Sequence, residues 1–295
     1  MRLRILLSLL MLGIFSMSYA QIPTLGLVAH YPFNGNANDS SGSGNNGTVY
    51  GATPTTDRFG NPNKAYSFNG SNYILVPNST SLNPSSQFSI SVWVQTTSSH
   101  SNAGIVGKWN QSTGINGGAE QYVILANNSG ATFAAKTNYQ STINESGIQY
   151  NNGLWHHYCG VWEGSTLKFY RDGILTSSAS LTGSLPGFNQ FLEIGRYTNG
   201  ILSSLFFTGK IDDIRIYNRS LNTTEISSIL NEPNPTLPLT SIPGSVYAYK
   251  KFSSTTGNLP FPLTNTDYFG WNAENIGDIN NDGVNDLALA YPHSS

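Results

Sequence analysis

The chain has 295 residues, of which 10% are charged and 12% are aromatic, and its formal net charge is −2. A chain so thinly charged and weakly acidic lacks the basic surface that nucleic-acid-binding proteins use, so that class is excluded. Its aromatic content and its recurring Val, Ile and Phe runs indicate a folded protein and exclude extensive disorder.

The first 20 residues have the features of an export signal. Arg2 and Arg4 precede an apolar run over residues 5–15, and Ser18-Tyr19-Ala20 supplies small residues before a cleavage site after Ala20. The run is shorter than the roughly 20 apolar residues that a membrane span needs. We therefore expect residues 1–20 to be a signal peptide, with an uncleaved anchor as the alternative. The mature protein is then secreted or on the cell surface, without a membrane span.

From residue 25 to about residue 217, short strand-like runs alternate with Gly, Asn and Ser turns. The residues of 88–95 alternate between apolar and polar or tryptophan side chains, which gives one apolar face. Arg171-Asp172-Gly173 predicts a tight hairpin, because Asp-Gly supplies the positive φ angles that such turns need. The pattern predicts an all-β sandwich with strands within residues 26–33, 64–70, 72–77, 88–95, 121–127, 154–162, 167–173, 191–195 and 210–218.

The order of these runs resembles the laminin-G-like, or concanavalin A-like, jelly roll. The resemblance rests on YPFNGNAND at 31–39, AYSFNG at 65–70, FSISVWV at 88–94, WHH at 155–157, YRDG at 170–173 and GKIDDIRIYNR at 209–219. It implies an antiparallel jelly-roll domain over residues 25–230. Near its end, Asn222 is placed to cap a short helix, while Glu225 reaches back to it.

Glycoside hydrolases on this fold use two carboxylates across a cleft, but no such pair is recognisable here. Asp212 and Asp213 are adjacent, so on a regular strand they are expected to face opposite sides of the sheet. His156 and His157 fail as a metal pair for the same reason, and a structural role is favoured. Cys159 lies in an apolar run and is expected to be a buried filler, because a nucleophile would need an oriented base beside it. The chain is therefore predicted not to be an enzyme.

The jelly-roll resemblance also implies a calcium site at Asp39 and Asp213, which is weaker than and second to the one expected over residues 278–286. Two structural roles compete with it: Asp39 could hold its own turn by bonding to the backbone, and Asp213 could pair with Arg215 on the same strand face. For a sugar-binding platform, Trp109, in the polar loop expected over residues 96–119, and Trp162 are candidates. Core packing is the favoured role for both, since aromatic side chains dominate sandwich cores.

Residues 231–243 contain four prolines and no helical period, and predict an extended linker. The stretch DINNDGVND at 278–286 then places oxygen-bearing side chains at alternate positions around Gly283. Oxygen ligands at this density suit Ca²⁺. The predicted metal ligands are Asp278, Asn280, Asp282, the Val284 carbonyl and Asp286. An EF-hand is excluded, because its twelfth loop position, which needs Glu, is Leu289 here.

The wider stretch from Phe269-Gly270 to Pro292 resembles the FG-GAP repeat of integrin-alpha-like β-propellers. The resemblance implies that residues 244–295 form a calcium-dependent, incomplete propeller blade. A blade cannot bury its faces alone, so we expect a sequence truncated from a longer protein.

These inferences together predict a secreted, non-catalytic, calcium-binding recognition or adhesion protein, with an extracellular glycan or protein as its ligand. The alternative is a jelly roll that is itself a polysaccharide-active hydrolase, or an accessory domain of one, whose catalytic part is missing from this chain.

Overall fold

The computed structural model describes residues 21–110, 119–127, 130–137, 140–144, 150–199, 203–234, 272–277 and 286–290. The chain divides into two compact units, Met1–Thr236 and Leu237–Ser295. Within the described residues of the second unit, β18 (Asn272–Gly277) and β19 (Asp286–Ala290) form an antiparallel pair. The loop of residues 278–285, which precedes β19, lies outside the described part.

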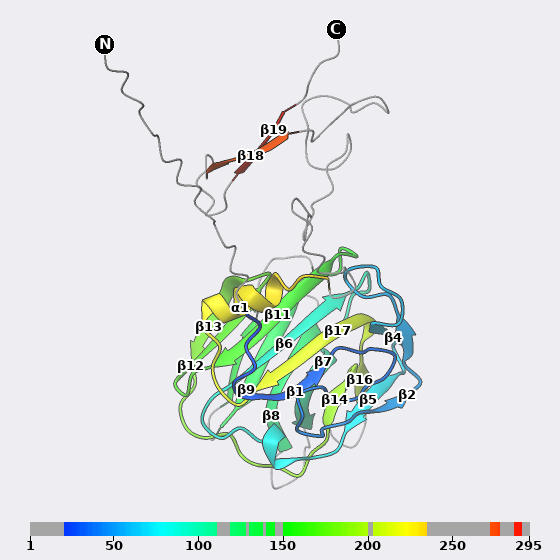
Figure 1. Ribbon diagram of the computed structural model, residues 1–295. Helices are drawn as coiled ribbons and strands as arrows, with labels where there is room; N and C mark the ends of the chain where they lie inside the picture. The colour runs from blue at the N-terminus through cyan, green and yellow to red at the C-terminus, as the bar shows by residue number, and fades with distance from the viewer. Residues whose placement is uncertain are drawn as a thin grey trace, which may run out of the picture. The chain divides into compact units, whose positions relative to one another are not determined.

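The first unit is an antiparallel β-sandwich of two sheets (Figure 1). The first sheet has the order β13-β12-β11-β6-β17-β4-β3, and β1 also pairs with β17. Its strands are β1 (Leu27–Tyr31), β3 (Thr53–Thr55), β4 (Ala65–Asn69), β6 (Phe88–Gln95), β11 (Trp155–Trp162), β12 (Thr166–Arg171), β13 (Ile174–Ser180) and β17 (Thr208–Tyr217).

The second sheet has the order β10-β9-β8-β7-β14-β5-β2, and a hairpin of β15 and β16 joins it through a parallel contact of β15 with β7. Its strands are β2 (Thr48–Tyr50), β5 (Tyr73–Val76), β7 (Ala103–Asn110), β8 (Ala119–Asn127), β9 (Gly130–Lys136), β10 (Gln140–Asn144), β14 (Leu192–Ile194), β15 (Arg196–Asn199) and β16 (Ser203–Phe206). A short 3-10 helix, η1 (Thr80–Leu82), lies between β5 and β6.

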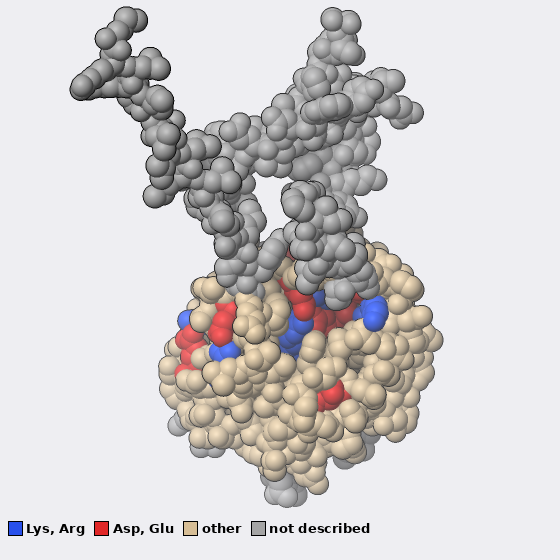
Figure 2. Space-filling view, viewed as in Figure 1, with Lys and Arg blue, Asp and Glu red and all other residues tan. Residues whose placement is uncertain are grey.

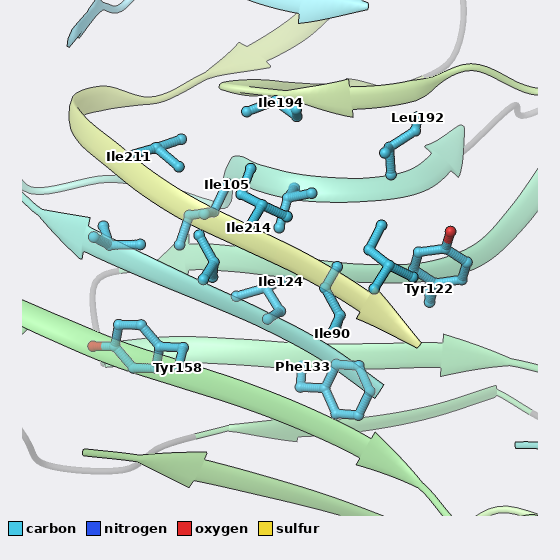
Figure 3. Packing of buried hydrophobic residues seen from close by; sticks show 14 of the residues in the cluster. Ile90, Ile105, Tyr122, Ile124, Phe133, Tyr158, Leu192, Ile194, Ile211 and Ile214 are labelled. Atoms are coloured by element: carbon cyan, nitrogen blue, oxygen red, sulfur yellow. The ribbon is translucent and has the colours of Figure 1, made fainter. Parts of the chain in front are cut away.

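The core fills the space between the sheets with alternate side chains of the central strands (Figure 3). On β6, the inward residues Phe88, Ile90, Val92 and Val94 belong to it, as the alternation predicted. Burying each such side chain stabilises the fold by about 1.5–3 kcal/mol. The sheets approach so closely that a Cβ on Gly160 would lie 2.6 Å from the Phe133 ring.

The helix α1 (Thr223–Leu230) covers part of the outer face of the first sheet. Ile226 and Ile229 pack there with Cys159, Val161 and other apolar residues. The predicted capping box is confirmed: the Glu225 N–H donates to the Asn222 side chain at 2.9 Å, and the Asn222 N–H donates to Glu225 Oε2 at 3.0 Å.

Each strand run predicted in the body of the chain overlaps an observed strand. The hairpin prediction is confirmed too, because Asp172 (φ 49°) and Gly173 (φ 80°) connect β12 directly to β13. The prediction of a polar loop over residues 96–119 is wrong, since β7 occupies Ala103–Asn110 in the middle of the second sheet. Within the described residues, no helix is long and apolar enough to cross a membrane.

Candidate functional site

The predicted calcium loop falls almost entirely outside the described residues. Asp278, Asn280, Asp282 and Val284 lie in the part that the structure does not describe, and Asp286 is placed only as the first residue of β19. The loop therefore stays a prediction from sequence.

Asp39, one half of the predicted second calcium site, organises the turn that follows β1. Its Oδ1 accepts from the His30 and Ser41 backbone N–H groups at 2.9 and 2.8 Å. Its Oδ2 accepts from the Ser41 hydroxyl and the Asn45 N–H, both at 2.9 Å. These are the contacts of a turn-holding aspartate, and a calcium ion would have to displace some of them.

Asp213, the other half, lies in a β-bulge of β17. The pairing of β17 with β6 shifts register between Asp212 and Arg215, and Asp213 has a positive φ of 48°. The expectation that Asp212 and Asp213 face opposite sides of the sheet is therefore wrong. The extra residue of the bulge reorients the strand locally, and both carboxylates reach the same guanidinium: Arg58 donates to Asp212 at 2.8 Å and to Asp213 at 3.0 Å.

Around this bulge lies a charged cluster, which we define as Arg58, Asp212, Asp213, Arg215 and Glu232. Arg215 donates to Asp213 at 2.7 Å, as anticipated, and to Glu232 at 2.8 Å. The His30 ring also contacts Asp213, at 2.9 Å. The cluster lines a pocket of about 380 Å³. In Figure 2, acidic and basic residues meet near one end of the sandwich, whereas most of the described surface on the face shown is uncharged.

The cluster holds its carboxyl groups in different states. Burial, aided by the charge of Asp213, raises the pKa of Asp212 to about 7 even though Arg58 opposes the shift. Burial acts on Asp213 in the same direction, but the positive charges of Arg215 and Arg58 and the hydrogen bond from His30 hold its pKa well below the usual range. Burial and Asp213 raise the pKa of Glu232. Divergent carboxyl pKa values occur in acid–base pairs, yet both aspartates are almost fully buried and tied to arginines.

None of the carboxylates described in residues 21–234 stands unpartnered across a cleft. Each accepts hydrogen bonds from a basic side chain, a backbone N–H or a neighbouring polar side chain. They are Asp39, Asp57, Glu120, Glu163, Asp172, Glu193, Asp212, Asp213, Glu225 and Glu232. Nor do three His, Cys, Asp or Glu side chains of the described residues come together as a metal site.

The remaining candidate side chains have structural environments. His156 lies near the start of β11 and contacts Asp172 at 2.8 Å, whereas His157 is fully buried beside Ser91. Cys159 is buried under α1, and burial raises the pKa of its thiol to about 12, so it is a poor nucleophile.

The two candidate tryptophans are both buried. Trp162 lies in the core and its Nε1–H donates to the Leu181 carbonyl at 2.9 Å. Trp109 packs with Tyr197, Val123 and other apolar residues in a separate cluster. Core packing, the favoured role, is confirmed for Trp162, and neither ring is exposed as a platform.

Two of the described aromatic residues, Tyr50 and Phe191, are exposed, and only Tyr50 is stacked on a second aromatic ring. Tyr50 of the edge strand β2 is directly opposite Tyr73 of β5, and the two rings stack with centroids 4.7 Å apart. The Arg196 guanidinium lies 3.5 Å from the centre of the Tyr73 ring. The signal that could have found this surface is the alternation Thr48-Val49-Tyr50 between two glycines, which is a short strand pattern.

A family profile described as the concanavalin A-like lectin/glucanases superfamily, of a laminin G type, matches residues 68–227, more than half of the chain. The chain belongs to this superfamily. None of the curated proteins matches it by sequence. The jelly-roll identification is thus confirmed, whereas no match to a propeller repeat accompanies it.

Several solved structures share the fold. Domain 4 of AbnA, a GH43 extracellular arabinanase from Geobacillus stearothermophilus solved with arabinotriose, is similar with a TM-score of 0.55 and 22% identity over 69% of this chain and 97% of that one. The binding domain of Paraclostridial Mosquitocidal Protein 1 has a TM-score of 0.57 and 19% identity, over 70% of this chain and 52% of that one. A structure of botulinum neurotoxin type C, described as interacting with two ganglioside molecules, is also similar. Its TM-score is 0.53 and its identity is 15%, over 70% of this chain and 51% of that one. This chain spans about half the length of the two toxin chains. At these identities the likeness shows the fold alone.

Proposed function

We propose that this protein is an extracellular, non-catalytic recognition protein whose jelly roll binds a glycan. The observation that carries the proposal is the state of the carboxylates: each one described in the sandwich is already held by a partner. A glycosidase needs two carboxylates that face the substrate. Membership of a lectin and glucanase superfamily supports a sugar as the ligand. Because one fold hosts many functions, the ligand has to be tested directly.

The proposed extracellular location rests on residues 1–20, whose charged start and apolar run have the pattern of a signal peptide. The proposal of a second, adhesive unit rests on sequence alone, on the calcium loop predicted over residues 278–286 and on the FG-GAP resemblance.

A second candidate function is that of an accessory, sugar-binding domain in a polysaccharide-active hydrolase. It is favoured by the similarity to domain 4 of an arabinanase, which this chain covers almost completely. Both candidates share glycan binding by the jelly roll and differ in what the rest of the protein does.

The proposal is tested by two assays on the full chain. We expect binding to at least one class of glycan on an array of pentose and hexose oligosaccharides. We expect no release of reducing sugar when the bound polysaccharide is incubated with the protein. Release of product that an Asp212→Asn variant abolishes would contradict the non-catalytic assignment, and the absence of any glycan binding would contradict recognition itself.

A further inference from the structure

We propose that the Tyr50 ring, at the edge of the second sheet, is the platform on which a sugar ring of an uncharged glycan stacks. The proposal rests on the proposed function and deepens it by naming the site and the ligand class. The site, called here the Tyr50 platform, consists of Tyr50, Tyr73 and Arg196.

The first step is the geometry of the stack. The rings of Tyr50 and Tyr73 are nearly parallel, with an interplanar angle of 14° and centroids 4.7 Å apart. The Arg196 Cζ lies 3.5 Å from the Tyr73 ring centre. Two groups cannot occupy one face of a ring at these distances, so Tyr50 and Arg196 lie on opposite faces of Tyr73. The result is a three-layer stack that ends at the outer face of Tyr50.

The second step is the position of the stack on the sandwich. Ile74 and Val76 of β5 point into the core, so the alternate residue Tyr73 faces outward. Tyr50 pairs directly with Tyr73 on the same side. Because β2 is the last strand in the order of the second sheet, the described sheet places no further strand beside Tyr50. Tyr50 is accordingly 45% exposed.

The third step is rigidity. Glu193 fixes Arg196 through contacts of 2.9 Å to Nε and 2.8 Å to a terminal nitrogen, and Thr198 donates to both Glu193 oxygens at 3.2 Å. Phe206 packs near Tyr73, with ring centroids 6.2 Å apart. A Tyr50 ring supported in this way loses little freedom when a ligand stacks on it, and such preorganisation favours binding.

The fourth step is charge. The positive charge of Arg196 is matched by Glu193, so the stack offers no unbalanced charge to an anionic ligand. An aromatic face attracts the C–H face of a sugar, and nearby polar groups can contact its hydroxyls. The exposed Thr48 lies two residues before Tyr50 on the same strand face, and the Asn72 amide lies against Gly51. An uncharged pentose or hexose ring fits this combination better than a uronic acid, a sialic acid or a phosphate.

The alternative role of the pair is to stabilise the edge strand, as cross-strand aromatic pairs do. The two roles are separable, because stacking on a sugar needs an aromatic ring at position 50, whereas support of β2 needs only a large apolar side chain.

The test uses the full chain, an array of uncharged and anionic oligosaccharides, and calorimetric titration with the uncharged oligosaccharide that binds best. We expect Tyr50→Ala and Tyr50→Leu each to weaken binding about tenfold or more, and Tyr50→Phe and Tyr50→Trp to retain it. Tyr50→Leu keeps an apolar side chain packed on Tyr73, so that β2 stays supported. Thermal melting of each variant checks that it is folded. The matched control is Ile174→Ala, because Ile174 is 70% exposed on β13, at the edge of the other sheet.

Wild-type affinity in both Tyr50→Ala and Tyr50→Leu would overturn the platform while leaving glycan recognition intact. A preference for anionic oligosaccharides would also overturn it. Failure of the wild-type chain to bind any oligosaccharide would overturn the proposed function together with the platform.

Discussion

His157 is a fully buried titratable side chain on the outer face of the first sheet. Its Nε2 lies 2.7 Å from the Ser91 hydroxyl, its Nδ1 is buried without a hydrogen-bond partner, and its ring lies 5.2 Å from the Trp93 ring. Burial lowers the pKa of His157 to about 4, with Asp213 and Asp172 opposing the shift and Arg58 and Arg215 adding to it. The imidazole is therefore neutral in the folded protein at physiological pH.

This state makes stability depend on pH in a defined window. Between pH 6.5 and about pH 4 the unfolded chain binds a proton at His157 and the folded chain does not. The contribution of the neutral His157 to the free energy of unfolding is therefore fully present above pH 6.5, and it is lost as the pH falls from 6.5 to about 4. We expect His157 to remove up to about 3 kcal/mol of the free energy of unfolding between these limits.

The comparison of the wild type with His157→Gln isolates this contribution. Asp212, whose pKa is raised to about 7, acts in the opposite direction, because its folded state binds a proton before its unfolded state does. That contribution is present in both proteins. Urea unfolding at several pH values should show a steeper acid-side loss of stability in the wild type than in the variant, and parallel curves would refute the assignment.

At the scale of the element, α1 depends on its first turn. Asn222 satisfies an N–H group of that turn, and Glu225 is held both by the Asn222 N–H and by Arg219. The helix has only eight residues, which is too short to be stable alone in water. Its cap and its packing on Cys159 and Val161 therefore determine whether it forms.

We expect Asn222→Ala to lower the free energy of unfolding by about 1 kcal/mol, because the variant leaves the Glu225 N–H without its side-chain acceptor. Asn222→Asp should keep the stability, since aspartate also caps and carries a negative charge favoured at a helix N-terminus. Denaturant midpoints of the two variants measure the difference. An Asn222→Ala midpoint equal to that of the wild type would show that the cap contributes nothing.

The strands show what the sequence could and could not predict. Runs such as 88–95 were recognisable because their inward residues are large and apolar. β7 was missed because glycines interrupt it, and these glycines are required by close packing. A Cβ on Gly104 would lie 2.1 Å from the Arg196 backbone, and one on Gly107 would lie 2.5 Å from the Tyr122 carbonyl oxygen. Because neighbouring backbone lies so close to β7, the strand needs glycine at these positions, and a glycine-rich sequence is also typical of loops.

The candidate sites were less predictable for a related reason. The bulge at Asp213 depends on how β17 pairs with β6, and only the tolerance of aspartate for positive φ hints at it locally. The Tyr50 platform depends on the register of β2 against β5 and on Arg196 from a distant strand. Contacts between distant segments leave no periodic pattern in the local sequence, so the sequence alone does not predict them.

At the scale of the whole molecule, the two outer faces of the sandwich differ in chemistry. The first sheet carries the buried charged cluster and α1 on its outer face, where nearly every charge is matched. The second sheet carries the Tyr50 platform at its edge. Within the cluster, Arg58 and Arg215 hold Glu232, and beside the cluster the Asn61 amide donates to Asn234.

The second unit is where the calcium hypothesis is decided. If residues 278–286 form the predicted loop, the carboxylates of Asp278, Asp282 and Asp286 would repel one another without a cation between them. We expect the full chain to bind Ca²⁺ in calorimetric titration, with Asp282→Ala weakening one site about tenfold or more because a charged ligand is lost. Asp39→Asn serves as the control, since it alters the other proposed site and leaves this loop intact. If Asp282→Ala binds Ca²⁺ like the wild type while Asp39→Asn does not, the ion belongs to the jelly roll, and the ligand set at residues 278–286 is wrong.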